Sequence, residues 1–212
     1  MVGVDLAETV NSLQDAEFFK LYGAWAPLDP AGVAALLDGS GVRWWVVGGR
    51  AARVGAAPRH HDDTDVAFRY ADLPVLQHHL RDWHLWETHQ GTLRPLLPGF
   101  DLLPDREQLW LRRDARHPWV LDLLVQRNDD EWVFKKDARV RLPWDRALHR
   151  VDGIWYLRPE IALLHKAHIN RPKDRADLSA AVLTPDARAW LAEALDLLGY
   201  AEWAGVVRAP TG

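Results

Sequence analysis

Apolar and polar positions follow two different periods along this chain, and the change between them falls near residue 158. In the first part, short apolar runs and alternating segments predict strands. The expected strands cover residues 44–47, 64–70, 84–89, 108–112, 119–126, 132–134 and 154–157. After Pro159 the spacing becomes helical, and helices are predicted over residues 160–168, 174–183 and 185–198.

Helices are also predicted among the early strands. An amphipathic pattern covers about the first 25 residues, and Asp29-Pro30 is typical of an N-cap followed by proline at the first helical position. Further helices are predicted over residues 31–41, 50–55 and 71–83. The pattern as a whole predicts an α+β domain over residues 1–157 and a helical lobe over residues 158–212.

Composition narrows the class of protein. The chain has 212 residues and a formal net charge of -4, which gives no reason to expect a basic surface that wraps nucleic acid. Cysteine is absent, which excludes disulfides, thiolate metal sites and cysteine nucleophiles. No apolar run approaches the roughly 20 residues of a membrane helix, and the acidic start lacks a signal-peptide pattern. We therefore expect a cytoplasmic enzyme or binding protein with no membrane contact.

The candidate chemistry begins with Asp63-Thr64-Asp65, at the start of the second expected strand. Alternate strand residues point to the same face, about 6.5 to 7 Å apart along the chain. Two carboxylates placed in this way can share one hard cation or bridge two, and oxygen-only ligands suit magnesium. An isolated pair of this kind is more often solvated charge in a loop, so its neighbours decide the interpretation.

Two glycines and a third carboxylate strengthen the case. Gly48-Gly49 follows a buried strand and precedes a helix, where backbone N–H groups can meet phosphate oxygens; a simple tight turn is the alternative. Asp122 lies inside an apolar strand, where a bare charge is costly, so it should be paired, metal-bound or at a strand edge. An ion pair with Arg127 or Arg113 is the alternative to a metal there.

Two basic residues, Arg59 and His61, precede the acidic pair. They could touch phosphate or orient a ligand, or they could simply balance the nearby acids. The order strand, Gly-Gly, short helix, Asp-x-Asp strand and later Asp resembles the polymerase-beta-like nucleotidyltransferase superfamily. Residues 46–68 carry this motif, and the form Arg-x-His-x-Asp-x-Asp is similar to its aminoglycoside adenylyltransferase-like branch of small bacterial proteins.

A second stretch, residues 152–178, is similar to the helical segment of many small bacterial members. It has a proline-acid helix start, a lysine further along, and then Arg-x-Lys-Asp-x-x-Asp-Leu. There are departures from the pattern. Thr64 replaces the usual isoleucine or leucine on the side away from the metals, and Arg50 follows the glycines where serine commonly contacts phosphate. The span from Gly49 to Asp63 is also slightly short.

The resemblance implies a nucleotidyltransferase-type mixed sheet flanked by helices, and transfer of a nucleoside monophosphate to a hydroxyl group. ATP would be the co-substrate, and two magnesium ions would be held by Asp63, Asp65 and Asp122. By the same resemblance, Asp122 would accept the hydroxyl proton or bind the metal that acidifies it. The implied nucleotide-binding residues are Gly48, Gly49, Arg50, Arg59, His61, Lys166 and Lys173.

Several of these residues also have simpler interpretations. Lys166 could be a surface lysine that lies over the core. Asp174 could cap the following helix and Asp177 could be a surface charge. Tyr156 and Glu160, near the expected lobe boundary, could meet the acceptor.

Three functions compete. The first is adenylylation of a small hydroxylated molecule, an aminoglycoside-like antibiotic, which predicts an acidic cleft for a polycation. The second is a toxin-type or regulatory enzyme that modifies RNA or protein, which predicts a basic patch leading to Asp122; its candidates are Arg112, Arg113, Arg116, Arg139 and Arg141. The third is a non-catalytic nucleotide-binding or partner-binding module. A zinc site at His165 and His168, or at His60-His61, is conceivable but has no third helix-borne ligand.

Overall fold

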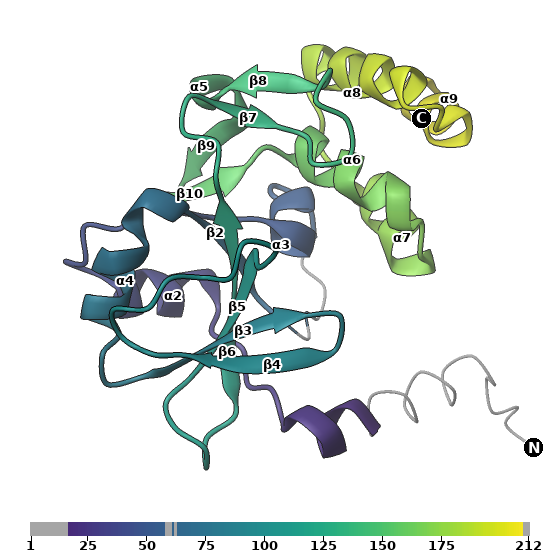
Figure 1. The fold of residues 1–212 in the computed structure, drawn as a ribbon. Coiled ribbons are helices and arrows are strands. Elements are labelled where there is room, and N and C mark those ends of the chain that lie inside the picture. The colour runs from purple at the N-terminus through teal and green to yellow at the C-terminus, as the bar shows by residue number, and fades with distance from the viewer. Residues whose placement is uncertain (1–16, 58–60, 62, 210–212) are drawn as a thin grey trace, which may run out of the picture.

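The computed structural model describes residues 17–57, 61 and 63–209 (Figure 1). An eight-stranded sheet has the order β4-β3-β5-β6-β2-β1-β10-β9. Its strands are β1 (Trp44–Val46), β2 (Asp65–Arg69), β3 (His84–His89), β4 (Thr92–Leu96), β5 (Gln108–Arg112), β6 (Trp119–Gln126), β9 (Leu148–Val151) and β10 (Ile154–Leu157). Two further strands, β7 (Glu131–Val133) and β8 (Arg141–Pro143), form a separate antiparallel pair.

Helices occupy the gaps between strands and the end of the chain. They are α2 (Pro30–Leu37), α3 (Gly48–Ala52), α4 (Leu73–His79), α5 (Trp144–Ala147), α6 (Pro159–Ile169), α7 (Pro172–Ala180), α8 (Pro185–Leu197) and α9 (Ala201–Arg208), with a 3₁₀ turn over Tyr70–Asp72. The expected cap of α2 is present, because Asp29 Oδ1 accepts a hydrogen bond from the Gly32 N–H at 2.7 Å. Thr184 caps α8 in the same way.

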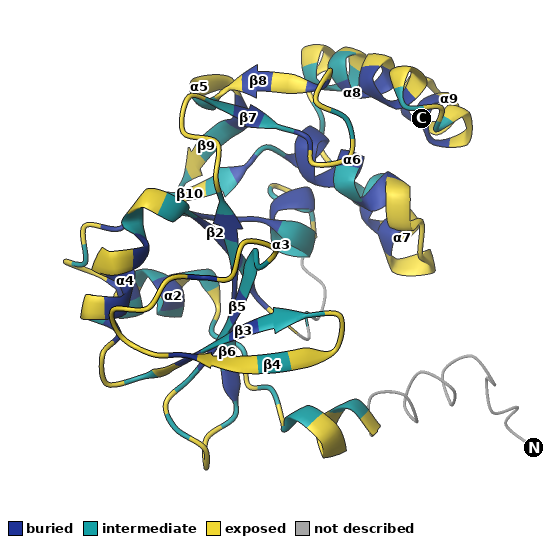
Figure 2. Ribbon diagram, in the orientation of Figure 1, coloured by how far each residue is buried: buried dark blue, intermediate teal, exposed yellow. Residues whose placement is uncertain are grey.

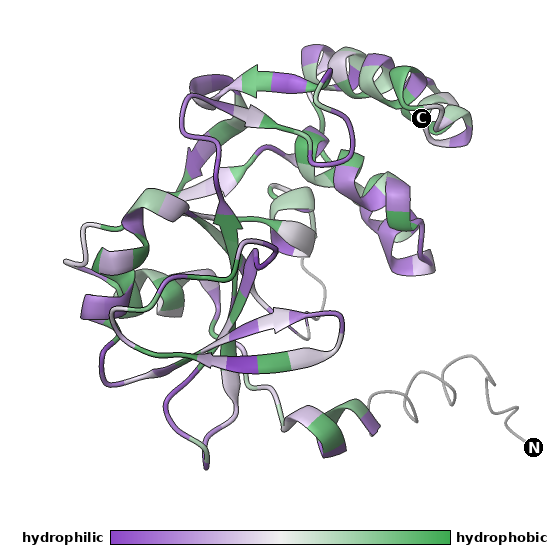
Figure 3. Cartoon of the chain, viewed as in Figure 1, coloured by the Kyte–Doolittle hydropathy of each residue, from purple (hydrophilic) through white to green (hydrophobic). Residues whose placement is uncertain are grey.

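The sheet separates two apolar cores, and each core is built from a different set of helices. On one face, α2 and α4 pack against strand residues that include Val66, Phe68 and Leu123. On the other face, α3, α6, α8 and α9 pack around Trp45, Ala67 and the β7–β8 pair. Figure 2 shows dark buried segments on the sheet and on the inner sides of α6 and α8, and Figure 3 shows apolar residues in the same places. Residues at odd positions of β2 therefore face α3 and α6.

The α+β fold class is confirmed, and most expected strands agree with the structure to within one or two residues. The expected helix over residues 71–83 is shorter, since α4 ends at His79. Of the expected N-terminal helix, residues 17–22 are helical, and its earlier part lies outside the described residues. The elements β4, β8, β9, α5 and α9 were not predicted. Both β4 and β8 contain proline and arginine, which obscures the alternation of a strand.

The expected boundary near residue 158 coincides with the start of α6 at Pro159. The helices beyond it share their core with Trp45 and α3, so they cover one face of the sheet. Among the described residues, the helices are too short or too polar to cross a membrane.

Candidate active site

Two aspartates lie opposite each other on neighbouring strands in the middle of the sheet. The parallel strands β2 and β6 pair in a register that places Asp65 beside Asp122. Because side chains on paired strand positions point to the same face, both carboxylates face α3 and α6. Asp63, two residues before Asp65, is exposed and lines the same cavity as Asp65. The structure thus brings together the three carboxylates that the sequence singled out.

Gly48 makes room for one of these carboxylates. Its φ of +64° lies in the left-handed region, which a residue with a side chain rarely adopts. A Cβ atom at this position would lie 1.9 Å from Oδ2 of Asp65. The close approach seats the Asp65 carboxylate directly against the backbone where α3 begins. Glycine is therefore required at position 48 for two reasons, the left-handed backbone conformation and the close approach of Asp65.

Asp65 and Asp122 are buried close to each other, and this disturbs the ionisation of both carboxyl groups. Burial raises the pKa of Asp65 to about 7, with a further increase from the Asp63 charge; Lys166, Lys173 and Arg171 act in the opposite direction. Burial and the Asp65 charge likewise hold the pKa of Asp122 well above its ordinary value. Carboxylates this close repel each other when they are ionised. A bound cation would relieve this repulsion, so the arrangement favours cation binding.

Asp122 is held by hydrogen bonds from the neighbouring strand. Gln108 on β5 donates from Nε2 to Asp122 Oδ2 at 2.6 Å, and Thr88 Oγ1 on β3 donates to Gln108 Oε1 at 3.2 Å. Among the described residues, the other oxygen, Asp122 Oδ1, is buried and has no hydrogen bond of normal geometry, although the Trp110 side chain on β5 lies close enough to lower the pKa of Asp122. A buried carboxylate oxygen left in this state is costly and favours a ligand.

The expected ion-pair partners of Asp122 lie elsewhere. The guanidinium of Arg127 lies over the Tyr70 ring at 4.2 Å, and that of Arg113 lies over the Trp83 ring at 5.4 Å. Among the described residues, neither of these arginines pairs with Asp122, and a neutral amide from β5 contacts its carboxylate instead.

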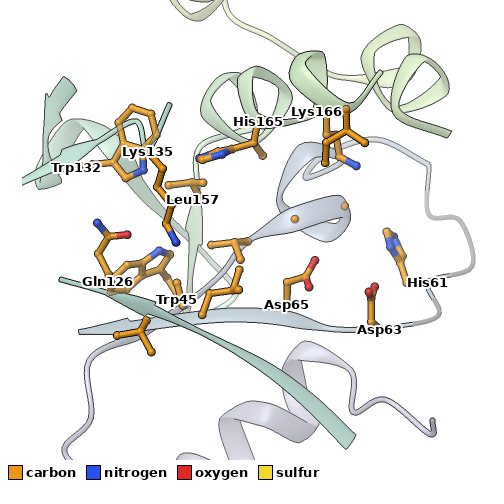
Figure 4. A pocket seen from close by; sticks show the side chains of 18 of the residues that line it. Trp45, His61, Asp63, Asp65, Gln126, Trp132, Lys135, Leu157, His165 and Lys166 are labelled. Atoms are coloured by element: carbon orange, nitrogen blue, oxygen red, sulfur yellow. The ribbon is translucent and has the colours of Figure 1, made fainter. Parts of the chain in front are cut away.

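A cavity of about 260 Å³ opens beside the acids. Figure 4 shows Asp63, Asp65 and His61 at one end and Trp45, Gln126, Trp132 and Lys135 at the other; from α6, Lys166 lies over the acids and His165 lies nearer the tryptophans. The basic side chains that line it are His61, Lys135, His165, Lys166, Arg171 and Lys173, and the only carboxylates among its described lining residues are Asp63 and Asp65. A cavity with this balance of charge suits an anion carried on metal ions.

Lys166 is buried, so the alternative of a surface lysine is wrong. Its Nζ lies 3.0 Å from Asp174 Oδ1 and 2.9 Å from Asp177 Oδ2, and both aspartates are fully buried. Arg171 also contacts Asp174, and Arg53 at the end of α3 contacts Asp177. The interpretation of Asp177 as a surface charge is therefore wrong. These ion pairs join α3, α6 and α7 next to the cavity, and Lys166 also lines the cavity.

Asp174 has a second function in the fold. It is the third residue of α7 and accepts the Arg171 backbone N–H at 3.0 Å, so Arg171, and not Asp174, is the N-cap. Burial raises the pKa of Asp174, but hydrogen bonds from Arg171 and Lys166 outweigh burial and bring it to about 2. Asp174 is therefore ionised wherever the protein is folded near neutral pH.

The remaining expected nucleotide-binding residues divide into two groups. Gly48, Gly49, His61 and Lys173 line the cavity. Arg50 does not, because its Nε donates to Thr64 Oγ1 at 3.0 Å on the opposite side of β2. Arg59 lies outside the described residues, as does His60.

The expected acceptor-contacting residues lie away from the acids. Tyr156 pairs with Val46 across β10 and β1, and Glu160 lines a second cavity of about 220 Å³ together with Arg158 and Trp190. Burial raises the pKa of Glu160. Neither residue lines the cavity of Asp63 and Asp65.

Sequence reasoning missed several residues of this site: Gln108, Gln126, Trp132, Lys135 and Arg171. Arg171 opens the Arg-x-Lys-Asp-x-x-Asp-Leu pattern, so that motif could have indicated it, whereas the other four belong to no recognisable motif. For Gln126, the alternation within residues 119–126 placed it on the same face as Asp122.

The three carboxylates form a donor set that fits a hard divalent cation. All three supply oxygen, as magnesium prefers. The fit is supported by the bare Oδ1 of Asp122 and by the raised pKa of Asp65. Within the described ranges, no preformed group of three or more histidine or acidic ligands surrounds a single point. Substrate phosphates and water would therefore supply part of the coordination shell. His165 and His168 contact different partners, the Phe134 ring and the Tyr200 hydroxyl.

Part of the chain matches a known family of enzymes. Residues 31–95 match the family described as aminoglycoside-2''-adenylyltransferase, which is a kind of nucleotidyltransferase. The match contains β1, the Gly48-Gly49 turn and the Asp63–Asp65 pair, and it covers less than half of the chain. The resemblance to aminoglycoside adenylyltransferases that these motifs indicated is confirmed over that stretch.

One solved structure is similar to this chain over most of its length. The solution structure of the antibiotic-resistance factor ANT(2'')-Ia aligns with 83% of this chain and 85% of that chain, at 15% identity and a TM-score of 0.40. That similarity is too low to carry an argument about this chain. The search of curated proteins found no match.

Proposed function

We propose that this protein transfers AMP from ATP to a hydroxyl group of a small molecule, with an aminoglycoside-like compound as the acceptor. One observation carries the proposal. Asp63 and Asp65 lie at one end of a cavity whose other charged residues are basic, and Asp122 lies directly behind Asp65 on the neighbouring strand β6. The match of residues 31–95 to an adenylyltransferase family supports the choice of nucleotide and acceptor.

The residues of the site have distinct tasks in this reaction. Asp63, Asp65 and Asp122 would hold magnesium, two ions in the proposed form, which neutralises charge on the phosphate oxygens when bound. Lys173 and the exposed part of Arg171 line the cavity and can contact the triphosphate. Lys166 is held by two aspartates, so it stabilises the site through its charge and is a weaker candidate for direct contact.

The chemical step is an in-line displacement. The acceptor hydroxyl oxygen forms a bond to the α-phosphorus, the bond from that phosphorus to the bridging oxygen breaks, and pyrophosphate leaves with the electron pair. The hydroxyl proton would move to Asp122, or Asp122 would hold the metal that acidifies the hydroxyl group. Gln108 keeps one oxygen of Asp122 fixed, and the other oxygen is buried, so a ligand would reach it only after the surrounding side chains shift.

This cavity is not the acidic cleft expected for a polycationic acceptor. Its only described carboxylates are the two that would hold metal, and five or more basic side chains line the rest. The cavity therefore suits the nucleotide, and the acceptor would reach Asp122 from another side.

The proposal for RNA or protein acceptors finds less support. Of the five arginines considered for a basic patch, Arg112 packs on Trp86 and Trp119, Arg139 pairs with Asp137, and Arg141 pairs with Glu131. Guanidinium groups engaged in this way are poor candidates for a phosphate-binding surface. A non-catalytic nucleotide-binding module is the remaining alternative, and the presence of all three carboxylates argues against it.

The test is a transfer assay with magnesium and labelled nucleotides, using an aminoglycoside panel, transfer RNA and the protein itself as acceptors. We expect label on an aminoglycoside with ATP as donor. Asp63→Ala should reduce transfer by roughly 100-fold or more, whereas Asp130→Ala, at an exposed loop position, should not. Transfer that survives Asp63→Ala would refute the metal-site assignment. Absence of transfer to every acceptor would favour the binding module.

A further inference from the structure

The cavity has a second end that the transfer chemistry does not use. We propose that this end is the nucleobase site, that Trp45 and Trp132 form its walls, and that Gln126 selects adenine. The inference rests on the proposed function, because it assigns the base of the same nucleotide whose phosphates meet the acids.

Three separate elements meet at this end. Trp45 comes from β1, Gln126 is the last residue of β6, and Trp132 comes from β7. Figure 4 shows them on the side of the cavity away from Asp63. A single cavity therefore connects the proposed triphosphate position with a group of aromatic and amide side chains.

The two tryptophans are held in place by other rings. Trp45 packs on Trp144 with ring centroids 5.0 Å apart, and Trp132 contacts Phe134, His165 and Trp190. Both line the cavity and are 3% exposed, so the small part of each ring that borders the cavity is held in place. Flat apolar walls suit a planar base, because any base has a face that can pack on aromatic side chains.

The charge at this end favours a neutral group over a polycation. Burial lowers the pKa of His165 to about 4, so its ring is neutral near pH 7. Lys135 is engaged by Glu107, with Nζ 2.6 Å from Oε2. No carboxylate among the described residues lines this end, so an aminoglycoside would find no anionic partner here.

Gln126 supplies the polar contact that a base requires. Its side chain is half-buried and lines the cavity, and within the described part of the chain its amide makes no hydrogen bond. A carboxamide offers one donor and one acceptor side by side, which matches the amino group and neighbouring ring nitrogen of adenine. Guanine presents two neighbouring acceptors, O6 and N7, which a free cation would contact. The cation at this end, Lys135, is already paired with Glu107.

The experiment separates the two ends by using a probe for each. Binding of adenosine, guanosine and inorganic tripolyphosphate is measured by calorimetry on the wild-type protein and on Gln126→Leu, with magnesium present for tripolyphosphate. We expect Gln126→Leu to weaken adenosine binding about tenfold and to reduce its preference over guanosine, leaving tripolyphosphate binding unchanged. Asp130→Ala, at an exposed loop position that does not line the cavity, is the control and should leave adenosine binding unchanged.

Three results would overturn the inference. These are unchanged adenosine binding in Gln126→Leu, an equal loss of adenosine binding in Asp130→Ala, and competition between adenosine and an aminoglycoside for this end. Thermal unfolding of each variant shows whether a loss reflects misfolding; Gln126→Glu, which keeps the size but removes the donor, should also weaken adenosine binding. Nucleoside binding that depends on Gln126 without any transfer would refute the proposed function and leave this inference standing.

Discussion

A Cβ atom on Gly48 would lie 1.9 Å from Oδ2 of Asp65, well inside any allowed contact. The glycine turn after β1 and the first residue of β2 are thus fitted to each other. This turn can contact phosphate, and its close approach to Asp65 gives it a second function. It fixes the position of a carboxylate at the centre of the acidic group.

Substituting Gly48 should therefore damage the site more than the fold. In Gly48→Ala the left-handed backbone costs roughly 1–2 kcal/mol, and the new methyl group must also push Asp65 aside. We expect transfer to fall by roughly 100-fold or more, the scale of losing a preorganised catalytic contact. The measurement is the transfer rate at saturating nucleotide together with the free energy of unfolding in urea.

Gly39→Ala is the matched control for that variant. Gly39 has a φ of +66°, and an added Cβ would meet nothing within 4 Å. It should lose a similar amount of stability and keep its activity. Equal loss of activity in the two variants would show that backbone strain alone, and not the contact with Asp65, is responsible.

The crowding of the acids predicts an unusual pH dependence for the metal-free protein. Burial and Asp63 raise the pKa of Asp65 to about 7, whereas its unfolded value is near 4. Below about pH 4 the group is protonated in both states and costs nothing. As the pH rises toward 7, the unfolded state ionises more readily, so the folded state loses stability, on the order of a few kcal/mol.

Asp65→Asn should remove this loss, since an amide does not titrate. Unfolding measured in EDTA from pH 4 to 8 should show wild type falling relative to the variant, and magnesium should restore part of the difference at pH 7. A wild type that gains stability relative to Asp65→Asn over this range would contradict the crowded arrangement.

The buried lysine predicts a large effect on stability. Lys166→Met leaves Asp174 and Asp177 with one cation fewer in a fully buried place, which should cost about 3 kcal/mol or more. Lys173→Met, at an exposed position on the same cavity, should leave the free energy of unfolding nearly unchanged and weaken tripolyphosphate binding. If the two variants unfold alike, the ion pairs of Lys166 contribute little.

Gln108 should act on Asp122 alone. Gln108→Leu removes the 2.6 Å hydrogen bond to Asp122 Oδ2, so the carboxylate loses its fixed orientation. We expect kcat to fall by roughly tenfold to a hundredfold with the KM for ATP unchanged, because the nucleotide contacts remain. Thr88→Val, which removes only the more distant hydrogen bond, should have a smaller effect; an effect equal to that of Gln108→Leu would contradict this order.

The sequence by itself determined the local elements and the residues of the acidic group. Alternation placed Asp63 and Asp65 on one face, and an apolar strand around Asp122 indicated that its charge needs a partner. Periodicity of this kind depends only on neighbours along the chain, which is why the strands over residues 84–89, 108–112 and 119–126 were predicted to the residue. Short polar strands such as β4 and β8 depend on pairing partners and were missed.

Only the tertiary structure decided which partners meet. The pairing of β2 with β6 placed Asp65 opposite Asp122, and the pairing of β5 with β6 gave Asp122 a glutamine in place of an arginine. The packing of α6 on α7 took Lys166 into a buried group of ion pairs. The strand contacts join residues far apart in the chain, and the ion pairs of Lys166 join two successive helices, so these contacts follow from strand register and helix packing, which spacing along a single sequence does not encode.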